Sequence, residues 1–291
     1  MMKKKSERRL IMKIRTVTGA VMTAVFVVPC IFSEYIVYPI VIALLCAMAV
    51  FEMLRVLGLH KHAAVSLPAY LIGAAMPIGA YFADRLEGGH RDYYLIMALA
   101  LVIYLVYLLA LAVILRGGLK FSSVSGVFMT VAYITVSFTA LTLLRYIEMG
   151  VFVFVIVFIS SCVCDIFAYF TGYLFGKHKL IPEISPKKTV EGAIGGTAFA
   201  VGGLLLYVFI VDRVADGVSV NYLLAAVYGL VLAVVGQLGD LIASFIKREY
   251  GIKDYGRLLP GHGGVLDRFD SMLTISLALL LISAALPPIF S

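Results

Sequence analysis

Tryptophan is absent from this chain, and only 14% of its 291 residues are charged. Soluble domains carry roughly 25% charged residues, whereas this chain is 62% hydrophobic, with a mean hydropathy of +1.03. The composition therefore excludes an ordinary soluble globular domain. Because tryptophan is missing, the 17 tyrosines must supply the aromatic side chains expected at a membrane interface.

Cysteine is scarce as well. The four cysteines, at positions 30, 46, 162 and 164, all lie inside apolar runs. This placement indicates neither a disulfide framework nor the paired Cys-x-x-Cys spacing of a zinc site. Cys162 and Cys164 could form part of a metal site, but we favour the interpretation that both are small buried hydrophobic residues.

Long apolar runs take the place of these missing features, and each is about the 20 residues that a helix needs to cross the hydrocarbon core. They cover 16–32, 35–54, 65–83, 93–115, 124–144, 151–175, 190–211, 222–245 and 269–289. We predict an all-α polytopic membrane protein with about nine transmembrane helices. The first run could be the apolar part of a signal peptide, but its length and the lack of a cleavage site favour a retained helix.

The positive charges predict how these helices are oriented. With a cytoplasmic N-terminus and alternating spans, 20 of the 24 lysines and arginines fall on the cytoplasmic side, as the positive-inside rule expects. The net charge of +7 then reflects topology, with attraction to anionic lipid as a second effect, and no nucleic-acid partner is needed. We divide the chain into a basic tail (1–15), N-terminal transmembrane helices (16–145) and a C-terminal transmembrane region (146–291) with cytoplasmic loops 176–189 and 246–268.

The segment 239–271 differs from an ordinary connector between membrane helices. It reads GDLIASFIKREYGIKDYGRLLPGHGGVLDRFDS and holds four aspartates and five lysines or arginines. Asp240, Ser244, Lys247 and Arg248 follow one face of a helix at its cytoplasmic end. A carboxylate, a hydroxyl and cations on one stripe suit a metal-bound phosphate better than a polar helix interface. Gly236 and Gly239 just before them predict close approach of another helix.

Acidic residues within apolar spans are functional candidates by default, because a charge in the membrane is costly. Glu52 and Asp165 qualify beside Asp240. For Glu52 we favour pairing with Arg55 or extension towards the interface. Asp165 lies deeper and needs a partner, so a structural hydrogen bond and a catalytic role stay open for it.

Glycine-rich backbone precedes the last apolar run. His262, Gly263 and Gly264 lie just before a predicted helix N-terminus, where unpaired N–H groups suit an anion. Asp267 and Asp270 lie three residues apart in the first turn of that helix. They could simply complement the helix dipole. However, Mg²⁺ uses one or two carboxylates together with substrate phosphates, and carboxylates from two helices beside a basic loop match that need.

The order of these residues resembles the signature of the phosphatidate cytidylyltransferases, membrane enzymes that make CDP-diacylglycerol from CTP and phosphatidic acid. This family also carries an S-P-x-K-T-x-E-G element, here 185–192, preceded by an aspartate-containing helix that ends A-Y-F-x-G, here 165–172. The similarity covers about 164–271, whereas the N-terminal half is similar only in its hydrophobicity.

The resemblance implies transfer of a cytidylyl group from CTP to phosphatidic acid with release of pyrophosphate, for phospholipid synthesis. It implies that Asp240 and Asp267 bind Mg²⁺ and allows a second cation such as K⁺. Implied catalytic residues are Asp240, Asp267, Lys247, Arg248 and Asp270. Implied substrate contacts are Ser185, Lys187, Lys188, Thr189, Ser244, Lys253, His262, Gly263, Gly264 and Arg268.

The expected partners are CTP, phosphatidic acid and the bilayer, with a homodimer allowed and no nucleic acid. The expected location is the cell inner (cytoplasmic) membrane, multi-pass, with the active site facing the cytoplasm. We assign the loop 246–268 chiefly to the CTP phosphates and Lys188 to the lipid phosphate. The alternatives are a transporter, against which the cytoplasmic position of the charges argues, and a CDP-alcohol phosphotransferase, whose D-G-x-x-A-R motif is missing.

Overall fold

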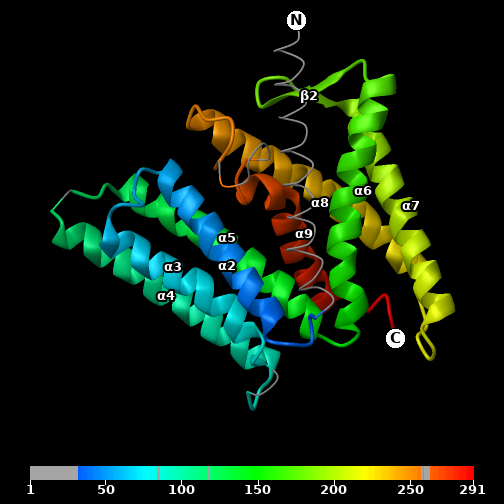
Figure 1. Cartoon of the computed structure of the whole chain (residues 1–291), viewed down its shortest axis with the longest axis horizontal. Coiled ribbons are helices and arrows are strands. Elements are labelled where there is room, and N and C mark those ends of the chain that lie inside the picture. Colours follow the sequence, from blue (N-terminus) through cyan, green and yellow to red (C-terminus); the bar gives the residue numbers. More distant parts are fainter. Residues whose placement is uncertain (1–31, 84–85, 117, 257, 259–262) are drawn as a thin grey trace, which may run out of the picture. The chain divides into compact units, whose positions relative to one another are not determined.

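The computed structural model describes residues 32–83, 86–116, 118–256, 258 and 263–291, and these contain eight α-helices and one two-stranded sheet (Figure 1). Every one of the eight is long and apolar enough to cross a membrane. The chain is therefore a multi-pass membrane protein. The helices are α2 (Val37–Val56), α3 (Ala63–Ala80), α4 (His90–Ile114), α5 (Phe121–Tyr146), α6 (Gly150–Phe175), α7 (Val190–Val214), α8 (Tyr222–Glu249) and α9 (Leu266–Ala285).

These helices confirm eight of the predicted spans to within a few residues, and the span at 16–32 falls outside the described residues apart from Phe32. The main difference is that α8 runs to Glu249 and includes Lys247 and Arg248 in its last turn. The apolar run ends near Phe245. The helix continues past it, because lysine and arginine in the last turn complement the helix dipole.

The chain forms two compact units. The first consists of the described part of residues 1–142 together with the described part of 252–268, and the second consists of 143–251 and 269–291. In the first unit, α2 packs on α3 and α3 on α4. The hydroxyl of the buried Tyr38 donates to the carbonyl of Leu141 in α5 at 3.0 Å. The rings of Tyr104 and Phe128 connect α4 and α5, with centroids 6.4 Å apart.

In the second unit, glycines bring α6 and α7 into close contact, and the two helices run side by side in Figure 1. A Cβ at Gly192 would lie 2.7 Å from the carbonyl oxygen of Ala168, and one at Gly196 would lie 2.8 Å from that of Cys164. These backbones are therefore packed more closely than any larger residue allows, as small residues permit in membrane helices.

Glycines also allow close packing of α8 against α9 within this unit. A Cβ at Gly239 would lie 2.8 Å from the carbonyl oxygen of Asp270, and one at Gly236 would lie 2.6 Å from the side chain of Ile275. The prediction that Gly236 and Gly239 permit close helix packing is confirmed. Asp240, next in the chain, is thereby held against the start of α9.

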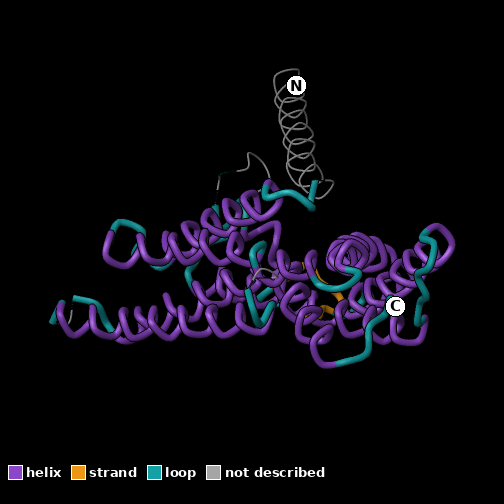
Figure 2. Tube along the Cα trace, turned by 90° about the horizontal axis from the view of Figure 1, so that it is seen from below, coloured by secondary structure: helices purple, strands orange, loops and turns teal. Residues whose placement is uncertain are grey.

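The segment 176–189 is more ordered than the loop that the sequence predicted. It forms an antiparallel hairpin of β1 (Lys179–Ile181) and β2 (Ser185–Thr189), drawn in orange in Figure 2. The carboxylate of Glu191 accepts the backbone N–H of Lys177 at 3.1 Å and that of His178 at 3.2 Å. Thr189 caps α7 by accepting the N–H of Gly192 at 3.1 Å. The hairpin contains few apolar residues, so hydropathy does not predict it. Hydrogen bonds rather than burial stabilise it.

Candidate active site

An ion pair defines the centre of charge in the second unit. The Nζ atom of Lys188 in β2 lies 2.6 Å from Oδ2 of Asp240 in α8. The other oxygen of Asp240 accepts the hydroxyl of Ser244, one turn along the same helix, at 3.3 Å. Both side chains of the pair are 26% exposed, so the pair is accessible from outside the protein.

Two further carboxylates lie close to this pair. Asp270 in α9 interacts electrostatically with Asp240, Lys247 and Asp165. The hydroxyl of Ser271 donates to Asp165 at 3.4 Å and lies 2.8 Å from the hydroxyl of Ser161. Asp165 therefore has a structural partner on another helix and also belongs to a group of three aspartates from α6, α8 and α9.

Cations balance these carboxylates. Lys247 is buried, with 9% of its surface exposed, and its ammonium interacts with Asp270. Arg248 extends outwards and its Nε donates to the carbonyl of Ile184, in the turn of the hairpin, at 3.3 Å. The two basic segments that the sequence separated therefore meet in this unit. The assignment of one segment to CTP and the other to the lipid stays a prediction.

The remaining predicted contacts of the hairpin are placed unequally. Lys188 is partly buried beside Asp240, whereas its neighbour Lys187 is exposed. Successive residues of a strand point to opposite faces, so the two lysines serve different surfaces. Ser185 pairs with Ile181 in the hairpin, and Thr189 is the buried cap of α7.

Asp267 belongs to the first unit and holds the segment that precedes α9. Its Oδ2 accepts the backbone N–H of Tyr255 at 2.8 Å and that of Gly264 at 2.9 Å. Gly263 adopts φ +88°, and a Cβ there would lie 2.8 Å from the same carboxylate oxygen. The expectation of an open N–H at Gly264 is therefore wrong, because that donor already binds a carboxylate of the chain itself.

The sequence interpretation of Glu52 is correct in part, because its carboxylate interacts electrostatically with Arg55, but it is wrong about extension towards the interface. Glu52 does not extend to the interface, because only 3% of it is exposed. Its Oε1 accepts the N–H of Val265 and its Oε2 that of Leu266, each at 2.9 Å. Arg55 in the same helix donates from Nη2 to the carbonyl of Tyr255 at 2.7 Å. The signal was present, since a carboxylate in an apolar span requires a partner, but its partner lies more than 200 positions along the chain.

Lys253 and Arg268 are exposed, and His262 lies outside the described residues. Among the described residues, no three histidine, cysteine, aspartate or glutamate side chains form a ready-made metal site. Mg²⁺ in general needs no such cluster, because it takes one or two carboxylates and completes its shell with water and phosphate oxygens.

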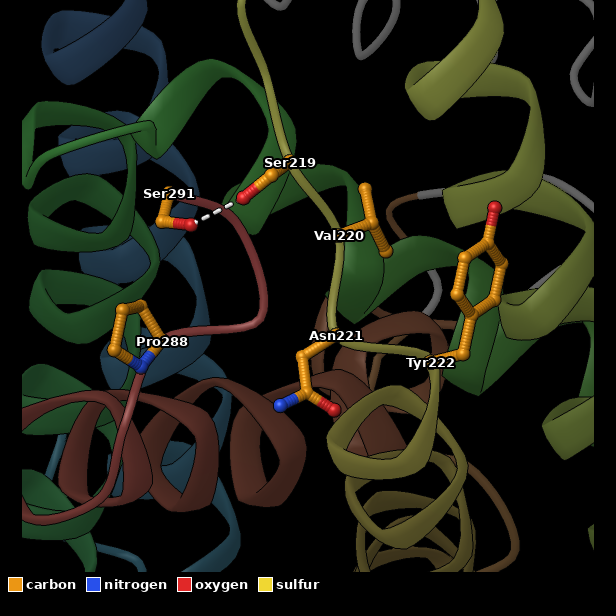
Figure 3. Close-up of a pocket in the computed structure, with 6 residues that line it drawn as sticks. All are labelled: Ser219, Val220, Asn221, Tyr222, Pro288 and Ser291. Atoms are coloured by element: carbon orange, nitrogen blue, oxygen red, sulfur yellow. Dashed lines mark hydrogen bonds between the residues drawn. The ribbon is translucent and has the colours of Figure 1, made fainter.

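A hollow of about 490 Å³ lies at the opposite end of α8 from these charges (Figure 3). It is lined by Ser219, Val220, Asn221, Tyr222, Pro288 and Ser291, and none of these side chains is charged at neutral pH. The hydroxyls of Ser219 and Ser291 lie 2.6 Å apart there. Asp240 follows Tyr222 by five turns of helix, or about 27 Å, so this hollow is remote from the charged groups.

Comparison with known proteins assigns the class. The model of the cytidylyltransferase family matches residues 13–285, so the chain belongs to this family of membrane enzymes. A protein named phosphatidate cytidylyltransferase from Staphylococcus epidermidis is 34% identical over 91% of this chain and 96% of its own length. One of the same name from Bacillus subtilis is 35% identical over 91% of this chain and 94% of its own. A third, from Staphylococcus haemolyticus, is 39% identical over 58% of this chain, which spans 62% of that relative's length.

Proposed function

We propose that the chain is a phosphatidate cytidylyltransferase that makes CDP-diacylglycerol and pyrophosphate from CTP and phosphatidic acid. The observation that carries this proposal is the meeting of Lys188 with Asp240 beside Lys247, Arg248 and Asp270. These residues fall in the segments that match the family, and they combine carboxylates for a cation with cations for phosphates. Two anionic substrates can react only where their mutual repulsion is neutralised.

In the proposed reaction, a phosphate oxygen of phosphatidic acid attacks the α-phosphorus of CTP. The new P–O bond forms as the bond from the α-phosphorus to the bridging oxygen breaks, and pyrophosphate leaves with that oxygen. No protein nucleophile is needed, since phosphoryl transfer depends mainly on positioning and on charge stabilisation. Lys188, Lys247 and Arg248 bind phosphate oxygens and hold the reacting groups in line. Lys253 and Arg268 are exposed and suit the outer phosphates.

We propose that Asp240 and Asp267 hold the Mg²⁺ of the reaction, with Asp270 close to Asp240. Mg²⁺ supplies charge neutralisation between carboxylates and phosphate oxygens, and a second cation such as K⁺ would add to it. What supports Asp240 is its accessible carboxylate, fixed on one side by Ser244. What supports Asp267 is the fixed orientation of its side chain by two backbone N–H groups.

We also propose that this site faces the cytoplasm from the inner membrane. The loops 176–189 and 246–268 together carry nine of the 17 lysines and arginines outside the N-terminal tail, as cytoplasmic segments do. Phosphatidic acid would then reach the site laterally from the bilayer while CTP arrives from water. A homodimer is compatible with this scheme, and the mass of the purified protein in nanodiscs distinguishes it from a monomer.

The proposed activity is tested with purified protein in liposomes. Pyrophosphate release should require both CTP and phosphatidic acid in the membrane, and the lipid product should carry the label of [α-³²P]CTP. Asp240→Asn, reconstituted equally, should release none. Flux of a solute without nucleotide, and no lipid labelling, would favour the transporter alternative.

A further inference from the structure

Glu52 supplies the N-terminal cap of α9 from a distant part of the chain. The first N–H groups of a helix have no partner within it, and here Val265 and Leu266 donate theirs to the two oxygens of one carboxylate, at 2.9 Å each. Glu52 is 3% exposed. A buried carboxylate that binds two N–H groups fixes both the position and the direction of the helix start.

The backbone around Glu52 leaves no room for any side chain. A Cβ at Gly264 would collide with both carboxylate oxygens of Glu52, and a Cβ at Gly256 would collide with one of them. The same Cβ at Gly256 would lie 2.9 Å from the Cα of Gly264. The backbones of Gly256 and Gly264 therefore both pack directly against the carboxylate of Glu52.

Arg55 holds the same segment from the next turn of α2. Its Nη2 donates to the carbonyl of Tyr255 at 2.7 Å, and the N–H of Tyr255 donates to Asp267 at 2.8 Å. Tyr255 itself is 2% exposed. One residue therefore connects the guanidinium of Arg55 to the carboxylate of Asp267, and Gly264, which packs on Glu52, gives Asp267 its second N–H.

We propose that Glu52 and Arg55 form a clamp that positions the carboxylate of Asp267 for the cation it shares with the substrates. This inference rests on the proposed function, in which Asp267 is a metal ligand. Glu52 and Arg55 act through Tyr255, Val265 and Leu266, which makes both of them positioning residues. The carboxylate of Asp267 must be held rigidly, because a metal ligand that shifts by about 1 Å no longer has the geometry that the metal requires.

The test compares Glu52→Gln with Glu34→Gln, a matched change at an exposed glutamate before α2. The amide of Glu52→Gln keeps the shape but places an N–H donor against a backbone donor. We expect the Mg²⁺ concentration for half-maximal turnover to rise about tenfold or more, with the KM of CTP changing less. Glu34→Gln should match the wild type.

A readout independent of activity is hydrogen–deuterium exchange in nanodiscs. Peptides covering 255–268 should exchange faster in Glu52→Gln, and Mg²⁺ with a non-reactive CTP analogue should protect them less than in the wild type. Peptides of α7 should be unchanged. Gly256→Ala offers a second route, because it displaces the segment without altering a charge and should reproduce both effects.

The inference is overturned if Glu52→Gln and Gly256→Ala leave Mg²⁺ dependence and exchange of 255–268 as in the wild type. It is also overturned if both variants speed exchange in all helices alike, since that reports general loss of structure. The proposed function fails separately, if the wild type forms no lipid product from CTP. In that case, faster exchange confined to 255–268 in Glu52→Gln would still show that Glu52 orders this segment, but the segment would have no role in cytidylyl transfer.

Discussion

Lys188 in β2 and Asp240 in α8 form an ion pair of 2.6 Å in which each side chain is about one-quarter exposed (26%). A partly exposed pair of this kind contributes little to stability, about 0–1 kcal/mol. In the proposed reaction, a phosphate would replace Asp240 as the partner of Lys188, and a cation would replace Lys188 as the partner of Asp240. We therefore interpret the pair as the resting arrangement of a binding site, in which Lys188 moves from Asp240 to a phosphate.

Lys188→Ala should weaken binding of both substrates. Because the hairpin and the end of α8 meet, we expect the KM of CTP and that of phosphatidic acid each to rise about tenfold, as the loss of a charge-assisted hydrogen bond worth about 1.5–3 kcal/mol predicts. Lys179→Ala in β1 of the same hairpin is the control and should change neither. A rise confined to phosphatidic acid would restore the division of labour expected from the sequence.

Asp240→Asn and Asp267→Asn should each abolish turnover while leaving the protein folded. Both carboxylates are proposed to bind the same charged assembly, so the double variant should be scarcely worse than either single one. Pyrophosphate release measures turnover, and the thermal transition in detergent measures folding. Near-normal activity of either variant at saturating Mg²⁺ would remove that aspartate from the site.

The glycine contacts between α6 and α7 predict a local stability effect. Gly192→Ala and Gly196→Ala should each destabilise the protein by roughly 1–3 kcal/mol, the usual cost of overpacking, because each Cβ meets backbone of α6 below 3 Å. Gly202→Ala in the same helix has nothing within 4 Å and should be neutral or slightly stabilising. Equal thermal transitions for the three variants would contradict the close packing.

Chemical labelling tests the proposed orientation. In a cysteine-free background, Tyr250→Cys should react with a membrane-impermeant maleimide only from the cytoplasmic side, and Val214→Cys only from the opposite side. Both residues are exposed at 44% and 76%, whereas Tyr255, near the middle of the loop, is too buried at 2% to serve as a probe. Labelling of Tyr250→Cys from the opposite side would show that the orientation is the reverse of the one proposed.

The fold could be predicted from the sequence where one physical signal dominates. Apolar runs gave eight helices because each must be about 20 residues long to cross the membrane. Short hydrogen-bonded structure gave no such signal, so β1 and β2 were missed. The predicted span ended at Phe245 because its hydropathy falls there, although helical spacing had already placed Lys247 and Arg248 on the same helix, which ends at Glu249.

The site was predicted unevenly for a related reason. Asp240, Lys247 and Arg248 follow each other at helical spacing, so local pattern was sufficient to group them. The bond from Lys188 to Asp240 joins separate segments, and pairings of that kind leave no trace in spacing. Glu52 shows the limit best. Its electrostatic interaction with Arg55, one turn away, follows from local spacing, but its hydrogen bonds to Val265 and Leu266 do not.

The fit of Glu52 between Gly256 and Gly264 has a consequence for hybrid enzymes. A chimera that joins the N-terminal helices of this chain to the C-terminal helices of a relative keeps Glu52 but takes the residues at positions 256 and 264 from the other parent. Hydrophobic matching of the spans would not reveal a mismatch there. Viable crossovers should therefore be those in which positions 52, 55, 256 and 264 remain mutually compatible, whichever parent supplies the remaining lipid-facing surface.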